Sequence, residues 1–159
     1  MADSSLQEQL TKYLTDAHSI EEQALAQLEV APRLAGDPEL AGIFQEHLGE
    51  TRGHESMTRN RLEALEADTS KLKDLVMKAG GTGFLLFAKV QPDTPGKLVA
   101  HAYSYEHMEL AAYELLGRVA ERAGDEETAE LARTIRDQEQ AMAERLASNF
   151  DRSYAFRNS

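Results

Sequence analysis

Four long segments of the chain repeat apolar residues at the spacing of an α-helix, and helix-ending or helix-starting residues separate them. Asp37-Pro38-Glu39 and Asp93-Thr94-Pro95 each place a capping residue before a proline, which is typical of the first turn of a helix. Gly124 is typical of a helix end, and Asp125 directly after it is typical of a helix start. The pattern predicts helices over approximately 5–31, 38–66, 95–123 and 126–149.

The connections between these helices are unequal in length. Short loops join the first helix to the second and the third to the fourth, whereas residues 67–94 form a long crossover between the pairs. Within the crossover we expect a short helix over approximately 70–79, ended by Gly80-Gly81. Two hairpins joined by one long crossover are the connectivity of a ferritin-like four-helix bundle. The sequence therefore predicts an all-α, ferritin-like four-helix bundle, and its 159 residues fit a single domain over 1–159.

Composition excludes several classes of function. The chain has no cysteine, which rules out disulfide bonds, thiolate metal sites and thiol nucleophiles. Its net charge of −11, from 17 Lys plus Arg against 28 Asp plus Glu, repels nucleic acid and anionic membrane surfaces. No apolar stretch is long enough to span a bilayer, and the N-terminus has no secretion signal, so we expect a cytoplasmic protein without nucleic-acid or membrane partners.

Each predicted helix carries glutamate where its apolar stripe should continue. The first, second and fourth helices place Glu21, Glu50 and Glu139 there, and the third places Glu106 and Glu109. Taken singly, such an acid is more often solvated or salt-bridged than bound to metal. One acid per helix at similar depth favours a shared cation site, because a buried carboxylate is costly unless it is paired or bound to metal.

Histidine completes the predicted donor set. Bundles that hold two iron or manganese ions use four Glu and two His, the latter in Glu-x-x-His pairs. Here Met142 stands where the fourth helix would carry its histidine, while His54 shares a helix face with Glu50. His47 is open to three interpretations: a ligand, a partner behind a ligand, or a core histidine. The predicted metal ligands are Glu21, Glu50, His54, Glu106, Glu109 and Glu139. This oxygen-rich set favours two iron ions, with manganese as the second choice.

Several motifs in these helices resemble the YciE/YciF-like family of ferritin-like bacterial proteins, which are associated with stress responses. The motifs are Asp16-x-x-x-x-Glu21-x-Gln23, His47-Leu48-x-Glu50-Thr51, Glu106-His107-x-Glu109-x-Ala111-Ala112-Tyr113, and Glu139 in the last helix. The resemblance implies a ferritin-like fold, a homodimer and metal bound among the four helices. The chain departs from the family in having His54 where Gln is more usual, and in lacking acids near Gln138 and Ala143.

Three functions are consistent with these features. The leading hypothesis is a stress-related protein that uses two iron ions to oxidise ferrous iron with oxygen or peroxide, or to dispose of peroxide. The second is a non-enzymatic stress-related or structural helical dimer that metal stabilises. The third is a metal-free helical adaptor whose acids are salt-bridged. The sequence assigns no catalytic residue beyond the metal ligands.

Overall fold

The computed structural model describes residues 4–65 and 92–154, and all of their regular structure is helical. The helices are α1 (Ser4–Leu34), α2 (Pro38–Ala64), α4 (Pro95–Ala123), α5 (Glu126–Ala147) and α6 (Phe150–Tyr154). The all-α prediction is confirmed. Most of the predicted crossover, including the short helix expected near 70–79, lies outside the described residues.

The helix starts follow the capping residues that the sequence indicates. The side-chain oxygens of Asp37, Thr94 and Asp125 accept hydrogen bonds from backbone N–H groups in the first turns of α2, α4 and α5. Gly124 adopts the left-handed backbone conformation, with φ of 76°, directly after α4. Because a side chain is strained in that conformation, glycine there allows the tight connection into α5.

Two helix ends differ from the sequence-based expectation. Helix α1 continues through Pro32 to Leu34, because a proline in the last turn removes only one hydrogen bond of the helix. Helix α5 ends at Ala147, and the chain then forms α6, where the sequence pattern predicted no helix after residue 149. Phe150 of α6 packs edge-on against Tyr103 of α4, with ring centroids 5.6 Å apart, and this contact gives the short helix a place on the bundle.

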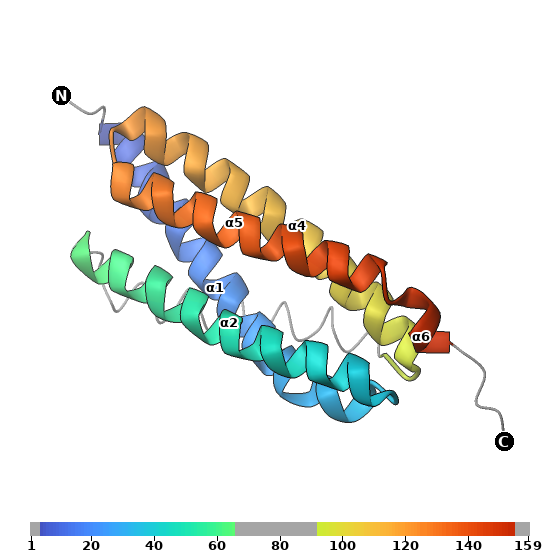
Figure 1. The fold of residues 1–159 in the computed structure, drawn as a ribbon. Helices are drawn as coiled ribbons and strands as arrows, with labels where there is room; N and C mark the ends of the chain where they lie inside the picture. Colours follow the sequence, from blue (N-terminus) through green and yellow to red (C-terminus); the bar gives the residue numbers. More distant parts are fainter. Residues whose placement is uncertain (1–3, 66–91, 155–159) are drawn as a thin grey trace, which may run out of the picture.

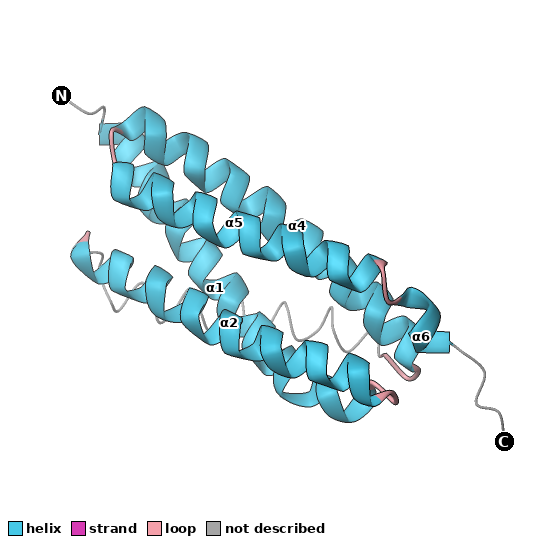
Figure 2. Ribbon diagram, viewed as in Figure 1, coloured by secondary structure: helices cyan, strands magenta, loops and turns pink. Residues whose placement is uncertain are grey.

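The helices form two antiparallel hairpins that pack against each other (Figure 1). Helix α1 pairs with α2, α4 pairs with α5, and α1 also packs on α4. Figure 2 shows that short loops join the helices within each hairpin. At one end, Arg61 of α2 links the hairpins by donating hydrogen bonds to Asp125, at 2.7 Å, and to Thr128, at 2.9 Å.

Within residues 4–65 and 92–154, the buried apolar residues form two clusters rather than one continuous core. One cluster, near the α1–α2 turn, contains Leu28, Phe44 and Leu146. The other, near the α4–α5 turn, contains Leu14, Leu62 and Leu116. Both clusters take residues from both hairpins, and on every long helix at least one buried polar residue separates them.

Within the described ranges, none of the helices combines the length and the apolar character that crossing a membrane requires.

Candidate metal centre

Seven of the buried polar residues between the two apolar clusters form what we call the polar layer. All of its members are at most 4% exposed, and they come from all four long helices: Glu21 of α1; His47, Thr51 and His54 of α2; Glu106 and Glu109 of α4; and Glu139 of α5. Burying four carboxylates together is unfavourable unless protons, histidines or metal ions compensate their charge. The layer therefore needs a physical explanation beyond packing.

Helix α2 turns a different residue inward from the one that the sequence pattern suggested. Its buried stripe runs through His47, Thr51 and His54, which are spaced by four and three residues. Glu50 is one position off this stripe, and its side chain is 46% exposed. It lies behind His47, with its Oε2 atom 3.7 Å from Nδ1 of the ring. The structure thus brings His47 into the layer and leaves Glu50, a predicted ligand, at its rim.

Glu139 lies at the centre of the layer, between two histidines. Its Oε2 atom is 3.3 Å from Nε2 of His47, and its Oε1 atom is 2.8 Å from Nδ1 of His54. Glu139 consequently belongs to two groups of candidate ligand atoms, each group lying within 4.8 Å. A carboxylate with one oxygen in each group has the geometry of a bridge between two ions.

The first group consists of His47, Glu106, Glu109 and Glu139. Nε2 of His47 lies 2.9 Å from Oε1 of Glu106. Neither oxygen of Glu109 has a hydrogen-bond partner within the described part of the chain. Three carboxylates and one imidazole thus converge from three helices, with oxygens to spare for a cation.

The second group consists of Glu21, His54 and Glu139. The hydroxyl of Tyr113 donates a hydrogen bond to Oε1 of Glu21 at 2.6 Å. On the other side, Nε2 of His54 donates to Oε1 of Gln138 at 2.5 Å, which turns Nδ1 toward the two carboxylates. Gln138 and Tyr113 were not assigned these roles from the sequence, because each contact joins residues 84 or 92 positions apart.

Many polar atoms in the layer lack hydrogen-bond partners. Within residues 4–65 and 92–154, the unpartnered buried side-chain atoms are Oε2 of Glu21, Nδ1 of His47, Oγ1 of Thr51, Nδ1 of His54, Oε2 of Glu106, and both carboxylate oxygens of Glu109 and of Glu139. Native interiors pair almost all such atoms. A concentration of unpartnered oxygen and nitrogen atoms in one layer is the pattern that bound ions would satisfy.

The charges in the layer perturb one another strongly. Burial raises the pKa of Glu21 to about 7 and that of Glu106 to about 8, and it raises the pKa of Glu109 well above its ordinary value. Burial alone would lower the pKa of His47, but the nearby carboxylates of Glu106 and Glu139 raise it to about 12. Burial also opposes ionisation of Glu139, yet His47 and His54 hold its pKa below the ordinary value. In the absence of metal, the layer therefore retains protons at neutral pH.

The donor set of the layer fits a pair of metal ions. Its four glutamates and two histidines are the same donors that dinuclear carboxylate bundles use, although here both histidines come from α2. Four ionised carboxylates would balance two divalent ions in charge. The sequence suggested that one histidine was missing at Met142, and the structure places His47 in the layer in its stead.

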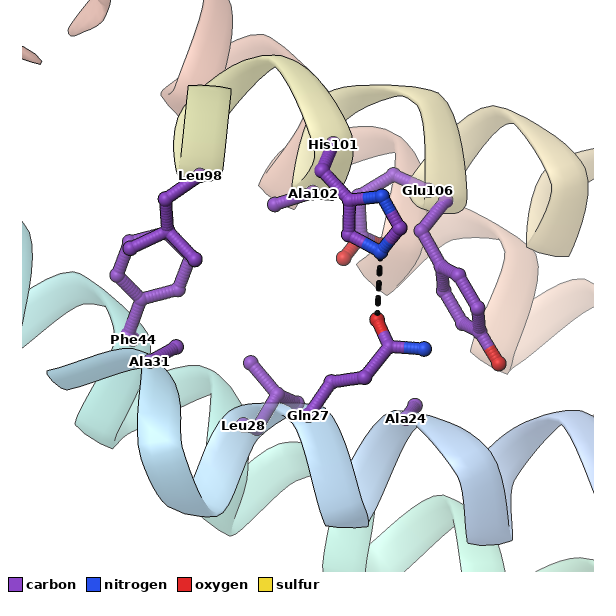
Figure 3. Close-up of a pocket in the computed structure, with 10 residues that line it drawn as sticks. Ala24, Gln27, Leu28, Ala31, Phe44, Leu98, His101, Ala102 and Glu106 are labelled. Carbon is purple, nitrogen blue, oxygen red and sulfur yellow. Dashed lines mark hydrogen bonds between the residues drawn. The ribbon is translucent and has the colours of Figure 1, made fainter. Parts of the chain in front are cut away.

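A small pocket reaches the layer between α1 and α4 (Figure 3). Its space of about 20 Å³ suffices for about one water molecule. Glu106 of the polar layer lines it, together with apolar residues such as Phe44 and Leu98. His101 donates from Nε2 to Oε1 of Gln27 at 3.2 Å across the pocket. The pocket thus connects the layer with space for a small molecule.

Residues 5–155 match the model of a family described as "Domain of unknown function (DUF892)". The chain belongs to this family. DUF892 is in turn a family of the ferritin-like superfamily, in agreement with the helical bundle. The chain is also similar to the crystal structure of a protein from Xanthomonas campestris pv. campestris, at 26% sequence identity, over 92% of each chain, with a TM-score of 0.73. No curated protein matches the chain.

Proposed function

We propose that the polar layer binds two transition-metal ions, with iron as the first choice and manganese as the second. The position of Glu139, with one carboxylate oxygen near each of two histidines, is the observation that carries this proposal. His47, Glu106 and Glu109 would hold one ion. Glu21 and His54 would hold the other, and Glu139 would bridge the two. Mixed carboxylate and imidazole donors suit Fe(II), Fe(III) and Mn(II).

The proposed activity is redox chemistry with a small oxidant, in which ferrous ions are oxidised by oxygen or peroxide, or peroxide is removed. The space of about 20 Å³ beside Glu106 supports a small reactant, since it has room for about one water molecule and none for a bulky substrate. Tyr113, hydrogen-bonded to Glu21, would orient that carboxylate toward the ions.

A stress-related role and a homodimeric assembly complete the proposal. The resemblance to YciE/YciF-like proteins supports the stress-related role. Met108 and Leu115, seven positions apart on α4, are 43% and 45% exposed, and two apolar side chains on one helix face support contact with a second copy. Sedimentation at roughly tens of micromolar protein, a concentration suited to a modest interface, tests this assembly. A monomer at that concentration would count against the homodimer.

Metal analysis of freshly purified protein, followed by anaerobic addition of Fe(II) and exposure to air, tests the proposed function. We expect two ions per chain, oxygen consumption, and an absorption band from the oxidised pair. Two bound ions without oxygen or peroxide consumption would favour the structural, metal-stabilised dimer. Failure to bind iron or manganese would favour the metal-free adaptor and would overturn the proposal.

A further inference from the structure

A second group of polar side chains lies outside the polar layer, on the α1–α2 hairpin. Its members are His18 and Glu22 of α1 and Glu55 of α2, whose candidate ligand atoms all lie within 4.8 Å of one another. Glu22 and Glu55 directly follow two residues of the polar layer in the sequence. Since one step along a helix turns the side chain by about 100°, they face a different side of the hairpin.

His18 is almost fully buried, and a hydrogen bond selects its tautomer. The residue is 5% exposed, and its Nδ1 atom lies 3.0 Å from Oγ1 of Thr58. The hydroxyl hydrogen of Thr58 is directed to the backbone carbonyls of residues 54 and 55, each 3.0 Å away. The Thr58 oxygen therefore accepts from Nδ1–H of His18, and Nε2 carries the lone pair of the neutral ring.

Two carboxylates lie on the Nε2 side of the ring. Nε2 of His18 is 3.9 Å from Oε1 of Glu22 and 4.0 Å from Oε1 of Glu55. Both separations are too long for a hydrogen bond. Two donor atoms of a tetrahedral zinc ion lie about 3.4 Å apart, so the two carboxylates would move about half an ångström closer to the ring on binding.

We propose that His18, Glu22 and Glu55 form an accessory site for one divalent transition-metal ion, separate from the pair in the polar layer. One imidazole and two carboxylates suit Zn²⁺ and Fe²⁺. Thr58 positions the imidazole, as partners behind metal-binding histidines commonly do. Side-chain exposure is 40% at Glu22 and 6% at His18, which gives an ion a way in from solvent.

Arg59 is the competitor of the metal ion in this site. Its NH1 group donates to Oε1 of Glu55 at 2.9 Å, the same oxygen that faces His18, while the arginine side chain is 48% exposed. A mobile surface cation can withdraw when an ion arrives, because exposed ion pairs are weak. A zinc ion and the guanidinium of Arg59 would therefore compete for the same oxygen of Glu55.

Zinc titration of the full chain tests the site independently of the polar layer. Calorimetry gives the number of zinc ions bound, and the ¹⁵N resonances of the His18 ring show whether this residue binds one of them. Glu22→Gln is the test variant because Glu22 is partly exposed, and Glu29→Gln, at an exposed position of the same helix, is the matched control. We expect the wild type and Glu29→Gln to bind one more zinc ion than Glu22→Gln, with the Nε2 resonance shifting on binding. Equal stoichiometry in the three proteins, or an unshifted His18 resonance in the wild type, would overturn the proposal.

Two further variants separate metal binding from simple ion pairing. Arg59→Gln should tighten zinc binding, because it frees an oxygen of Glu55. Thr58→Val should weaken binding by about 10- to 100-fold, the usual effect of losing a partner behind a metal-binding histidine. The His18 resonance reports on this site even if the polar layer binds no iron. Zinc affinity at His18 that is unchanged in both variants would contradict the proposal.

Discussion

Nδ1 of His54 lies 2.8 Å from Oε1 of Glu139, in a part of the molecule where the two side chains are 2% and 0% exposed. Gln138 accepts a hydrogen bond from the opposite nitrogen of the ring. Together these contacts fix both the orientation of His54 and the nitrogen that it presents to the polar layer. Metal binding should therefore depend on Gln138, a residue that is not itself a ligand.

Gln138→Leu should weaken metal binding by about 10- to 100-fold while leaving the helical content unchanged, because it removes only the acceptor behind His54. Gln138→Glu retains an acceptor oxygen and should restore most of the affinity. Gln140→Leu, at an exposed position of the same helix, is the control. Competition titration against a chelator measures the effect, and equal affinity in Gln138→Leu and the control would show that His54 is not oriented in this way.

Glu139→Gln should remove both metal ions, whereas Glu21→Gln should remove only one. The reason is that Glu139 belongs to both candidate groups and Glu21 to one of them. Both substitutions keep the side-chain shape, so circular dichroism should show nearly intact helices in each variant. Elemental analysis after iron loading gives the stoichiometry, and an equal loss in the two variants would argue against a bridging Glu139.

His47→Gln should impair metal binding far more than Glu50→Gln. His47 is buried in the polar layer, whereas the side chain of Glu50 is 46% exposed and lies 3.7 Å behind Nδ1 of His47. We expect Glu50→Gln to keep both ions with lower affinity, since it removes only a charge behind the ring. Metal titration of the two variants tests this ranking. The reverse order would return Glu50 to the role of a direct ligand.

The stability of the metal-free protein should fall as pH rises from about 5 to 8. The pKa values of Glu21 and Glu106 are raised by burial from 4.5 to about 7 and about 8, so the folded state holds protons that the unfolded state has lost. The raised pKa of His47, about 12 against 6.5, acts in the same direction above about pH 6.5.

The metal-loaded protein should show the opposite trend, since protons compete with metal ions for the same carboxylates. Melting temperatures of chelator-treated and manganese-loaded samples, measured at several pH values between about 5 and 8, test both trends together. Manganese avoids oxidation during the measurement. Parallel curves for the two samples would mean that the glutamates of the polar layer do not share metal ions.

Local sequence signals were sufficient to predict the helices and most of their ends. Asp37, Thr94 and Gly124 act on backbone groups within a few positions, so their effect can be predicted without knowing the fold. Helix α6 was missed because its position depends on Phe150 packing against Tyr103, a contact between distant segments.

The sequence predicted most members of the polar layer, but it did not predict how their side chains contact one another. The glutamates at 21, 106, 109 and 139 and the histidine at 54 all lie in it, and their role as ligands stays a prediction. Periodicity alone could not show whether His47 or Glu50 points into the layer. The two residues are three positions apart, and a small rotation of α2 about its axis decides which of them faces the interior. Contacts such as Tyr113 with Glu21 depend on how two helices are rotated toward each other, which a single sequence leaves undetermined.

The separation of the two apolar clusters by the polar layer affects where the molecule opens. An ordinary helical bundle frays from its ends, where hydrogen bonds are most easily lost. Here an apolar cluster holds each end, and both clusters draw residues from both hairpins. Without ions, the middle is the part with the least cohesion, so water should enter first beside His47 and Glu109, far from either helix turn. Amide exchange at mid-helix should then be faster in the metal-free chain than in the metal-loaded chain, because bound ions would join the two apolar clusters into one core.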